Sequence, residues 1–314
     1  MLKMKATSTT ALCLALLLAL STAARAQDKN TLSPSEAKAK QAYSLGVTAY
    51  IWGYPMVVMQ RSRDQMTKVG DAPVTPEQFS ESGLVFAPEN QVANAWSMLG
   101  PNFSAIQSAN SDTQYSVTWF DSSKEPYVLH IPDAKGRYYT YQFIDAFTNN
   151  FRYASTRTMG SQDQDYALVA PGWKGKLPQD VIRVDSPTPT GFIIGRWFVQ
   201  DEKDVPAVNA IQRKVTMTPL SSYGKAYTTP KVKVVPAKKY TGDLAFFEAL
   251  GDTLAINGAP AADAGLLGLL KNIGIGVDHG VVPCGRRGGV WWAGAVARAD
   301  GVGGLAARGG SWGG

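Results

Sequence analysis

The chain has 314 residues, a formal net charge of +6, 45% hydrophobic residues and two cysteines. The excess positive charge lies at the two ends, because Lys3, Lys5 and Arg25 supply half of it and residues 279–314 supply the other half. The stretch from 27 to 278 is therefore neutral and free of cysteine. Within it, neutrality argues against binding nucleic acid through phosphates, and the lack of cysteine excludes disulfides, thiol nucleophiles and Cys-based metal sites.

Residues 1–26 predict a cleavable export signal. Two lysines precede an apolar run over 11–20 that is too short to span a bilayer. The small residues Ala24 and Ala26 then precede a polar segment, which is typical of a cleavage site. We therefore expect a periplasmic or secreted protein with no stable membrane insertion after cleavage. A buried or membrane-anchoring helix is the alternative.

Residues 27–105 are predicted to be a helical and loop segment. Ser33 can cap a helix, Pro34 suits its first turn, and Glu36 can reach back to the amide of the cap. Apolar residues at three- and four-residue spacing predict the buried face of this helix: Tyr43, Val47, Tyr50, Ile51 and Tyr54. We expect Pro55 to kink or end the helix.

Residues 106–220 predict a β-sandwich domain. Polar and apolar residues alternate from Thr113, and the runs 127–132 and 137–145 are joined by the turn sequence Asp-Ala-Lys-Gly, which predicts a hairpin. Further short strands are expected at 166–170, 181–184 and 191–199, and a helix at 204–215. The fold class is therefore α+β, mainly β: an antiparallel, jelly-roll-like sandwich with an N-terminal helical segment and short C-terminal helices.

Residues 221–278 are predicted to be a linker and helical segment, with a strand at 231–235 and helices at 243–256 and 262–273. Residues 279–314 are rich in Gly, Ala and Arg and carry neither helical nor strand periodicity. We interpret this tail as an unfolded frameshift product, and a genuine Gly-rich tail is the alternative. A Gly-x-Ser-x-Gly match at 309–313 has no strand before it, so we reject it as a nucleophile elbow.

Several short motifs occur in one order along the chain: Asn110–Ser116, Gly136–Tyr139, Pro171–Gly175, Ser186–Thr188 and Thr218–Leu220. On these motifs the chain resembles a bacterial family named domain of unknown function 1254, over about residues 40–275. The resemblance implies a β-sandwich architecture, export, and a second domain, domain of unknown function 1214, which is missing or frameshifted here. It also suggests hydrolytic, metal-assisted activity.

The run 137–145 carries the main candidate site. In a strand, Arg137, Tyr139, Tyr141, Phe143 and Asp145 project from one face. A cation, two phenols and a carboxylate would form a polar pocket with aromatic walls, as small-molecule sites often have. The alternative is that Arg137 pairs with an acid such as Asp145 or Asp112 as a structural strut while the tyrosines fill the core.

Asp112 and Asp145 are the candidate catalytic residues, either as acid and base or as oxygen ligands of a divalent cation. Candidate substrate-binding residues are Asn110, Thr113, Tyr115, Arg137, Tyr139, Tyr141 and Arg157. The alternative for the segment around Asp112 is an Asx-turn. His130 is the only histidine from 27 to 278, which excludes a His-rich zinc site there and favours a structural role. A Ser-His-Asp triad through His130 stays open.

Two functional hypotheses follow. The first is a hydrolase of esters or phosphoesters, in which Arg137 holds the developing charge. The second is a non-catalytic envelope protein that binds a small molecule or carbohydrate on the aromatic face of Tyr139, Tyr141 and Phe143. In either case the partner is a small molecule and not nucleic acid, and a homo-oligomer is left open.

Overall fold

The computed structural model describes residues 32–69, 85–100, 103 and 109–276. The chain divides into two compact units: one comprises Met1–Val47 with Pro283–Gly314, and the other comprises Thr48–Val282. The predicted export signal, the tail and the Gly-x-Ser-x-Gly match all lie outside the described residues. All structural statements below concern the described part.

Helix α2 (Pro34–Thr67) begins as predicted. The backbone N–H of Ser33 donates to Glu36 Oε2 at 2.8 Å, and the N–H of Glu36 donates to Ser33 Oγ at 3.3 Å. Both bonds belong to a capping box, and the hydrogen bonds from Ser33 lower the pKa of Glu36. The helix start is therefore encoded locally in four residues.

Pro55 lies inside α2 and does not end it, so of the two predicted outcomes, a kink or an end, the end is wrong. Proline removes one helical hydrogen bond, and tertiary contacts on both sides of it offset that loss. Before Pro55, Trp52 Nε1 donates to Asp263 Oδ2 at 3.0 Å. After Pro55, Arg63 Nη2 forms a salt bridge with Glu89 Oε1 at 3.0 Å. The length of α2 therefore depends on tertiary packing, and Pro55 alone does not determine where the helix ends.

The buried face of α2 also differs from the prediction. In the unit from Thr48 onward, Ala49 and Met56 are fully buried, whereas Ile51 is 69% exposed and Tyr54 is 49% exposed. Small residues allow close approach, and a Cβ placed on Gly53 would lie 2.6 Å from a methyl carbon of Leu250. The buried face of α2 therefore contains Ala49 and Gly53, whose small size permits close packing, and not the predicted face with Ile51 and Tyr54.

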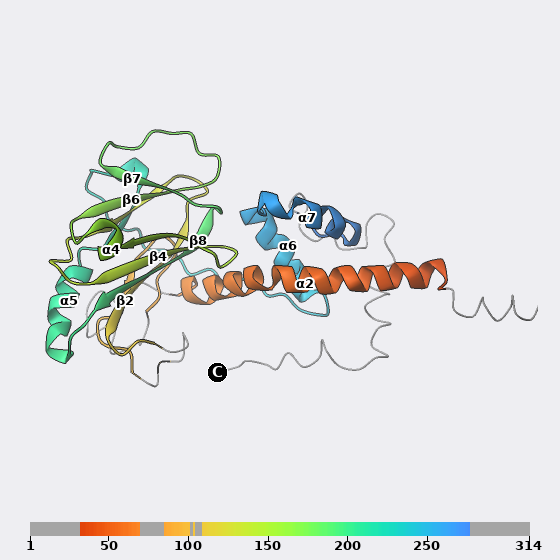
Figure 1. The fold of residues 1–314 in the computed structure, drawn as a ribbon, viewed down its shortest axis with the longest axis horizontal. Coiled ribbons are helices and arrows are strands. Elements are labelled where there is room, and N and C mark those ends of the chain that lie inside the picture. The colour runs from red at the N-terminus through yellow and green to blue at the C-terminus, as the bar shows by residue number, and fades with distance from the viewer. Residues whose placement is uncertain (1–31, 70–84, 101–102, 104–108, 277–314) are drawn as a thin grey trace, which may run out of the picture. The chain divides into compact units, whose positions relative to one another are not determined.

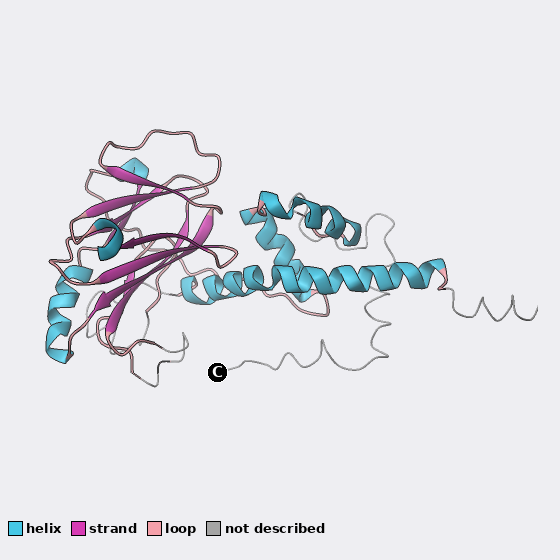
Figure 2. Ribbon diagram, in the orientation of Figure 1, coloured by secondary structure: helices cyan, strands magenta, loops and turns pink. Residues whose placement is uncertain are grey.

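The strands form two sheets, shown in Figures 1 and 2. The first has the order β1 (Ala93–Asn94), β2 (Thr113–Asp121), β8 (Thr190–Phe198), β4 (Tyr139–Asp145) and β5 (Asn150–Ser155), all antiparallel. The second has the order β7 (Val181–Asp185), β6 (Gln164–Val169), β3 (Tyr127–Ile131) and β9 (Thr216–Pro219), with only β6 and β7 parallel. The fold is therefore α+β with two mostly antiparallel sheets.

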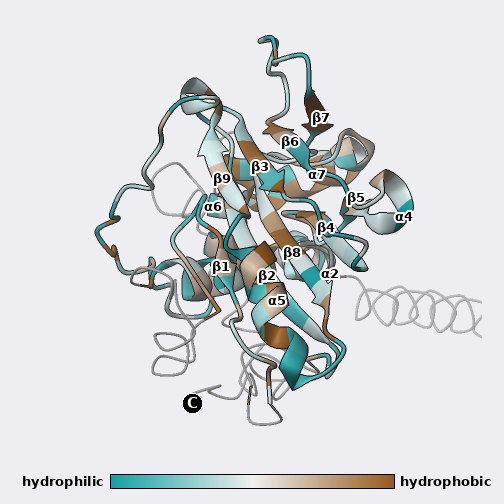
Figure 3. Ribbon diagram, turned by 90° about the vertical axis from the view of Figure 1, so that its left-hand side faces the viewer, coloured by the Kyte–Doolittle hydropathy of each residue, from teal (hydrophilic) through white to brown (hydrophobic). Residues whose placement is uncertain are grey.

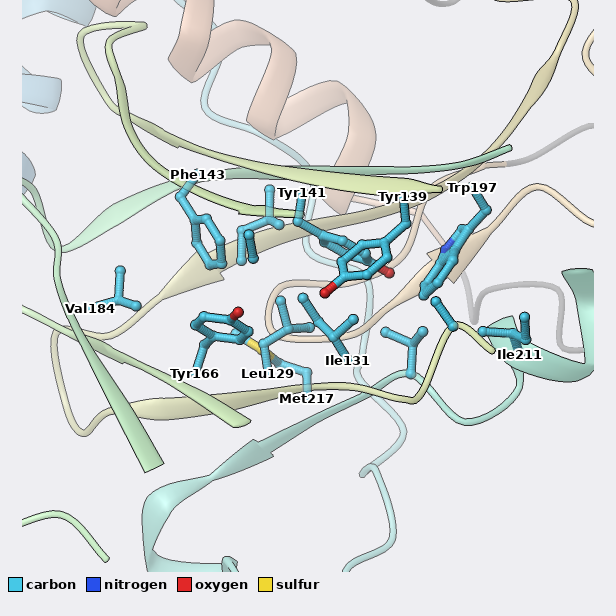
Figure 4. Close-up of a cluster of buried hydrophobic side chains, with 14 of the residues drawn as sticks. Leu129, Ile131, Tyr139, Tyr141, Phe143, Tyr166, Val184, Trp197, Ile211 and Met217 are labelled. Atoms are coloured by element: carbon cyan, nitrogen blue, oxygen red, sulfur yellow. The ribbon is translucent and has the colours of Figure 1, made fainter. Parts of the chain in front are cut away.

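One hydrophobic core joins the two sheets (Figure 4). The first sheet contributes Tyr139, Tyr141, Phe143 and Trp197, and the second contributes Leu129, Ile131, Tyr166 and Met217. Burial in β4 alternates residue by residue, which confirms the period of two predicted for this run. Each large side chain in such a core stabilises the fold by about 1.5–3 kcal/mol.

The predicted hairpin between β3 and β4 is wrong, because the two strands belong to different sheets. Lys135 and Gly136 have φ angles of 50° and 79°, and the turn that contains them carries the chain from one sheet to the other. Leu129 and Tyr139 both pack in the shared core. β3 and β4 therefore contact each other through side chains in the core and do not pair by backbone hydrogen bonds.

The described helices beyond α2 are α4 (Thr156–Met159), α5 (Val205–Gln212), α6 (Ala245–Asn257) and α7 (Ala264–Leu270), with 3-10 turns η2 (Glu202–Asp204), η3 (Leu220–Ser222), η4 (Ala261–Asp263) and η5 (Lys271–Ile273). They agree with the helices expected near 204–215, 243–256 and 262–273. The strand expected at 231–235 is absent, and its valines are exposed. No helix in the described part of the chain is long and apolar enough to cross a membrane.

Helix α5 buries only one side. Val208, Asn209, Ile211 and Gln212 are buried, whereas Ala207 and Ala210 are exposed. Figure 3 shows the corresponding mixture of brown apolar and teal polar residues along this helix. The exposed side of α5 is therefore available to form part of a surface site.

Candidate functional site

The two candidate catalytic carboxylates lie at opposite ends of β8. Asp145 pairs with Gly191 at one end, and the backbone oxygen of Asp112 accepts a hydrogen bond from the Val199 N–H at the other end. Eight residues of extended strand separate these points, a distance of about 26 Å. The structure therefore does not bring the two carboxylates into one site.

Asp145 organises the loop between β4 and β5. It is 3% exposed, and its Oδ1 accepts the backbone N–H groups of Phe147 at 2.8 Å and Asn149 at 2.9 Å. Its Oδ2 accepts the Asn149 side-chain amide at 3.2 Å. Thr148 within this loop has a φ of 67°, a left-handed conformation that such bonds help to hold. Both carboxylate oxygens are thus already used by the loop.

Near Asp112, the predicted ligand-binding residues are mostly exposed or occupied by local contacts. Asn110 and Asp112 are exposed, and the Asn110 N–H donates to the Tyr115 hydroxyl at 2.8 Å. Tyr115 also lies against the Arg196 guanidinium, which is 5.7 Å from the ring centroid. Thr113 is 8% exposed. These residues lie at and just before the start of β2.

The aromatic face predicted as a binding surface is core. Tyr139, Tyr141 and Phe143 are each at most 1% exposed, and Figure 4 shows them pointing between the sheets. Burial raises the pKa of both phenols. Arg157, predicted to bind substrate, is exposed on the short helix α4. The second hypothesis therefore cannot use this aromatic face, because a ligand could not reach it without opening the core.

Arg137 is a structural strut, but its acid partner is neither Asp112 nor Asp145. Its Nη1 and Nη2 donate to the two carboxylate oxygens of Asp204 at 2.5 and 2.7 Å, and Nη1 also donates to the Phe198 carbonyl at 2.6 Å. This bidentate pairing lowers the pKa of Asp204. It ties the turn after β3 to the segment that leads into α5.

A groove of about 530 Å³ opens between this turn and α5. It is lined by residues 133–138, Phe198, Ala207, Ala210, Ile211 and Lys214. Tyr138 is 48% exposed and Phe198 is 39% exposed, so aromatic surface is available to a ligand. Its volume lies within the range of small-molecule sites. Of the predicted site residues, only Arg137 lines it.

Buried polar contacts fix the α5 wall of the groove. Gln212 is fully buried, and its amide donates to the Tyr115 carbonyl at 2.9 Å. Asn209 is 4% exposed, and its amide donates to the Trp96 carbonyl at 3.0 Å. Hydrogen bonds of this kind are directional, so they set the orientation of α5 as well as its contact with β2. Side-chain hydrogen bonds thus hold α5, one wall of the groove, to β2 and to the segment around Trp96.

His130 has partners that the sequence did not reveal. Its Nδ1 lies 2.8 Å from Asp165 Oδ1, and the Tyr223 hydroxyl donates to Asp165 Oδ2 at 2.6 Å. The hydrogen bond between His130 and Asp165 raises the pKa of His130 and lowers that of Asp165. The separate hydrogen bond from the Tyr223 hydroxyl to Asp165 raises the pKa of Tyr223 to about 12. The cluster joins β3, β6 and the residue that follows η3. A structural role for His130, as predicted, agrees with these contacts.

This cluster predicts a pH-dependent contribution to stability. The raised pKa of His130 stabilises the fold below about pH 6.5 and this contribution is lost as pH rises through the folded pKa, whereas the lowered pKa of Asp165 stabilises the fold above about pH 4. In urea unfolding, we expect Asp165→Asn to reduce stability more near pH 5.5 than near pH 9. The exposed Asp243→Asn is the matched control, and an equal loss at both pH values would contradict the ion pair.

The described residues contain no group of three or more His, Cys, Asp or Glu side chains arranged to hold a metal ion. A divalent cation held by oxygen ligands therefore stays a prediction from the sequence. The sequence analysis did not single out most of the residues that line the groove, among them Lys135, Tyr138, Phe198, Ala210 and Lys214. The alternation of β4 could have indicated Tyr138, because it lies out of phase with the core tyrosines.

Residues 89–219 match the model of a family described as "Protein of unknown function (DUF1254)". No curated protein matches the chain. A crystal structure of the VPA0106 protein from Vibrio parahaemolyticus is similar, with a TM-score of 0.55 and 20% identity over 85% of this chain and 57% of that one. An uncharacterised protein from Burkholderia cenocepacia matches with a TM-score of 0.27 and 14% identity over 60% of this chain and 54% of that one. The chain thus spans just over half the length of either protein.

Proposed function

We propose that this protein, whose residues 89–219 belong to the DUF1254 family, is a non-catalytic protein that binds a small molecule in the groove beside α5. The observation that carries the proposal is the groove itself, with a volume of about 530 Å³ and two exposed aromatic rings. Aromatic walls with a few polar groups are typical of small-molecule sites. The second hypothesis from the sequence is thus kept, but its site moves from the core to the surface.

The hydrolase hypothesis receives less support from the geometry. Acid–base catalysis by two carboxylates requires both near one substrate, and Asp112 and Asp145 lie about 26 Å apart by strand length. Both carboxylate oxygens of Asp145 also accept hydrogen bonds from its own loop. Hydrolysis of an ester or phosphoester therefore stays a prediction from the sequence.

We also propose that the protein is exported to the periplasm or secreted, and that its two sheets are those of a β-sandwich. Export is supported by the two lysines before residue 6, the apolar run over 11–20, and the small residues Ala24 and Ala26 at the predicted cleavage site. The core shared by the two sheets supports the sandwich.

Filling the groove tests the binding function. Ala210 is exposed on α5 and lines the groove, so Ala210→Trp should occupy the site without disturbing the core. In a ligand-observed NMR screen of aromatic acids, amides, phosphates and glycosides, we expect the wild type to bind at least one compound and Ala210→Trp to lose that binding. Ala264→Trp, at an exposed position of α7, is the control and should bind like the wild type. Equal binding by both variants would overturn the proposal.

A further inference from the structure

We propose that the ligand of this groove is an organic anion with a planar or aromatic body, an inference that rests on the proposed binding function. The two walls of the groove each carry a lysine. Lys135 lies on the turn after β3, and Lys214 follows the end of α5. Both are exposed, and neither has a carboxylate partner within the described part of the chain.

The other charges at the groove are already engaged. Arg137 and Asp204 neutralise each other in a bidentate pair. Asp133 Oδ1 accepts the backbone N–H of Lys135 at 2.7 Å. With Arg137 neutralised by Asp204, the groove lining carries Lys135 and Lys214 against Asp133, which leaves one net positive charge. A ligand anion placed between the walls would be near both ammonium groups.

The aromatic part of the ligand is inferred from Tyr138 and Phe198. Tyr138 precedes β4 and Phe198 ends β8, and the Phe198 N–H donates to the Tyr138 carbonyl at 3.0 Å. Both side chains are exposed and line the groove. Exposed aromatic rings offer a flat apolar surface on which a planar group can stack. Ala207 and Ala210 on the opposite wall are small and leave room for it.

Matched pairs of compounds separate the charge from the shape of the ligand. We would measure the affinity of benzoate against benzamide, and of phenyl phosphate against phenyl glucoside, by ligand-observed NMR titration. The anion of each pair should bind roughly tenfold or more tightly than its neutral partner, and added salt should weaken only the anion. Lys135→Met and Lys214→Met should each weaken the anion roughly two- to five-fold while the aliphatic stem is kept.

Lys176→Met removes an exposed lysine outside the groove and should leave all four affinities unchanged. Neutral compounds that bind as tightly as the anions, or anion binding that neither groove lysine affects, would overturn the anion inference while the binding function stands. If no compound binds, or if Ala210→Trp leaves binding unchanged, the proposed function itself fails. The two failures are therefore distinguishable.

Discussion

Trp197→Ala should reduce the free energy of unfolding by about 3–5 kcal/mol, the usual range for truncating a buried tryptophan. Trp197 is fully buried in β8, and its ring packs 5.2 Å from that of Tyr139 and 5.7 Å from that of Tyr141, measured between centroids. Its Nε1 donates to Ser116 Oγ at 3.0 Å, so the substitution removes a buried hydrogen bond as well as apolar contacts. The cavity would lie where the two sheets meet.

Urea unfolding followed by circular dichroism measures this loss. Phe198→Ala is the matched control, because it changes the next residue of the same strand, whose side chain is 39% exposed at the groove. We expect that variant to lose less than about 1.5 kcal/mol. Similar losses for the two variants would show that Trp197 does not occupy the core as described.

Patterns that depend on neighbouring residues were predictable from the sequence. The capping box at Ser33 needs only residues within one turn, and the alternation in β4 follows from a strand with one face in the core. The same alternation could not show which inward groups were functional. Tyr139 and Tyr141 read as pocket walls because phenols are polar at one end, but their rings are large enough to fill the core between two sheets.

Features set by distant residues could not be predicted from one sequence. Arg137 was predicted to bind substrate, and the alternative was a pairing with Asp145 or Asp112. Its partner Asp204 lies 67 residues away, and no local pattern in the sequence indicates this pairing. The hairpin prediction failed for a related reason: turn residues at 133–136 indicate a reversal, but not whether the next strand joins the same sheet or the facing one. The groove lies between this turn and α5, so its existence depended on both of these distant pairings.

Asp145→Ala should destabilise the fold by about 2–4 kcal/mol, because it removes the acceptor of three N–H groups around a nearly buried carboxylate. Asp145→Asn keeps one carbonyl oxygen and should lose less. Asp112→Ala is the matched control: Asp112 was the other predicted catalytic carboxylate, but its exposed side chain should contribute less than about 0.5 kcal/mol. Urea unfolding of the three variants measures these differences.

The same variants separate a loop residue from a catalytic one. A panel of esters and phosphoesters, with and without EDTA, would be run at a temperature where Asp145→Ala remains folded. If Asp145 acts only on the loop, any turnover shown by the wild type should persist in the folded variant, since the groove lies at the other end of β8. Turnover that disappears in both Asp145→Ala and Asp112→Ala, with Asp145→Ala as stable as the wild type, would instead restore the carboxylates as a catalytic pair. That result would require a substrate or conformational change that spans about 26 Å of strand, because the pairing of β2, β4 and β8 holds the two side chains apart.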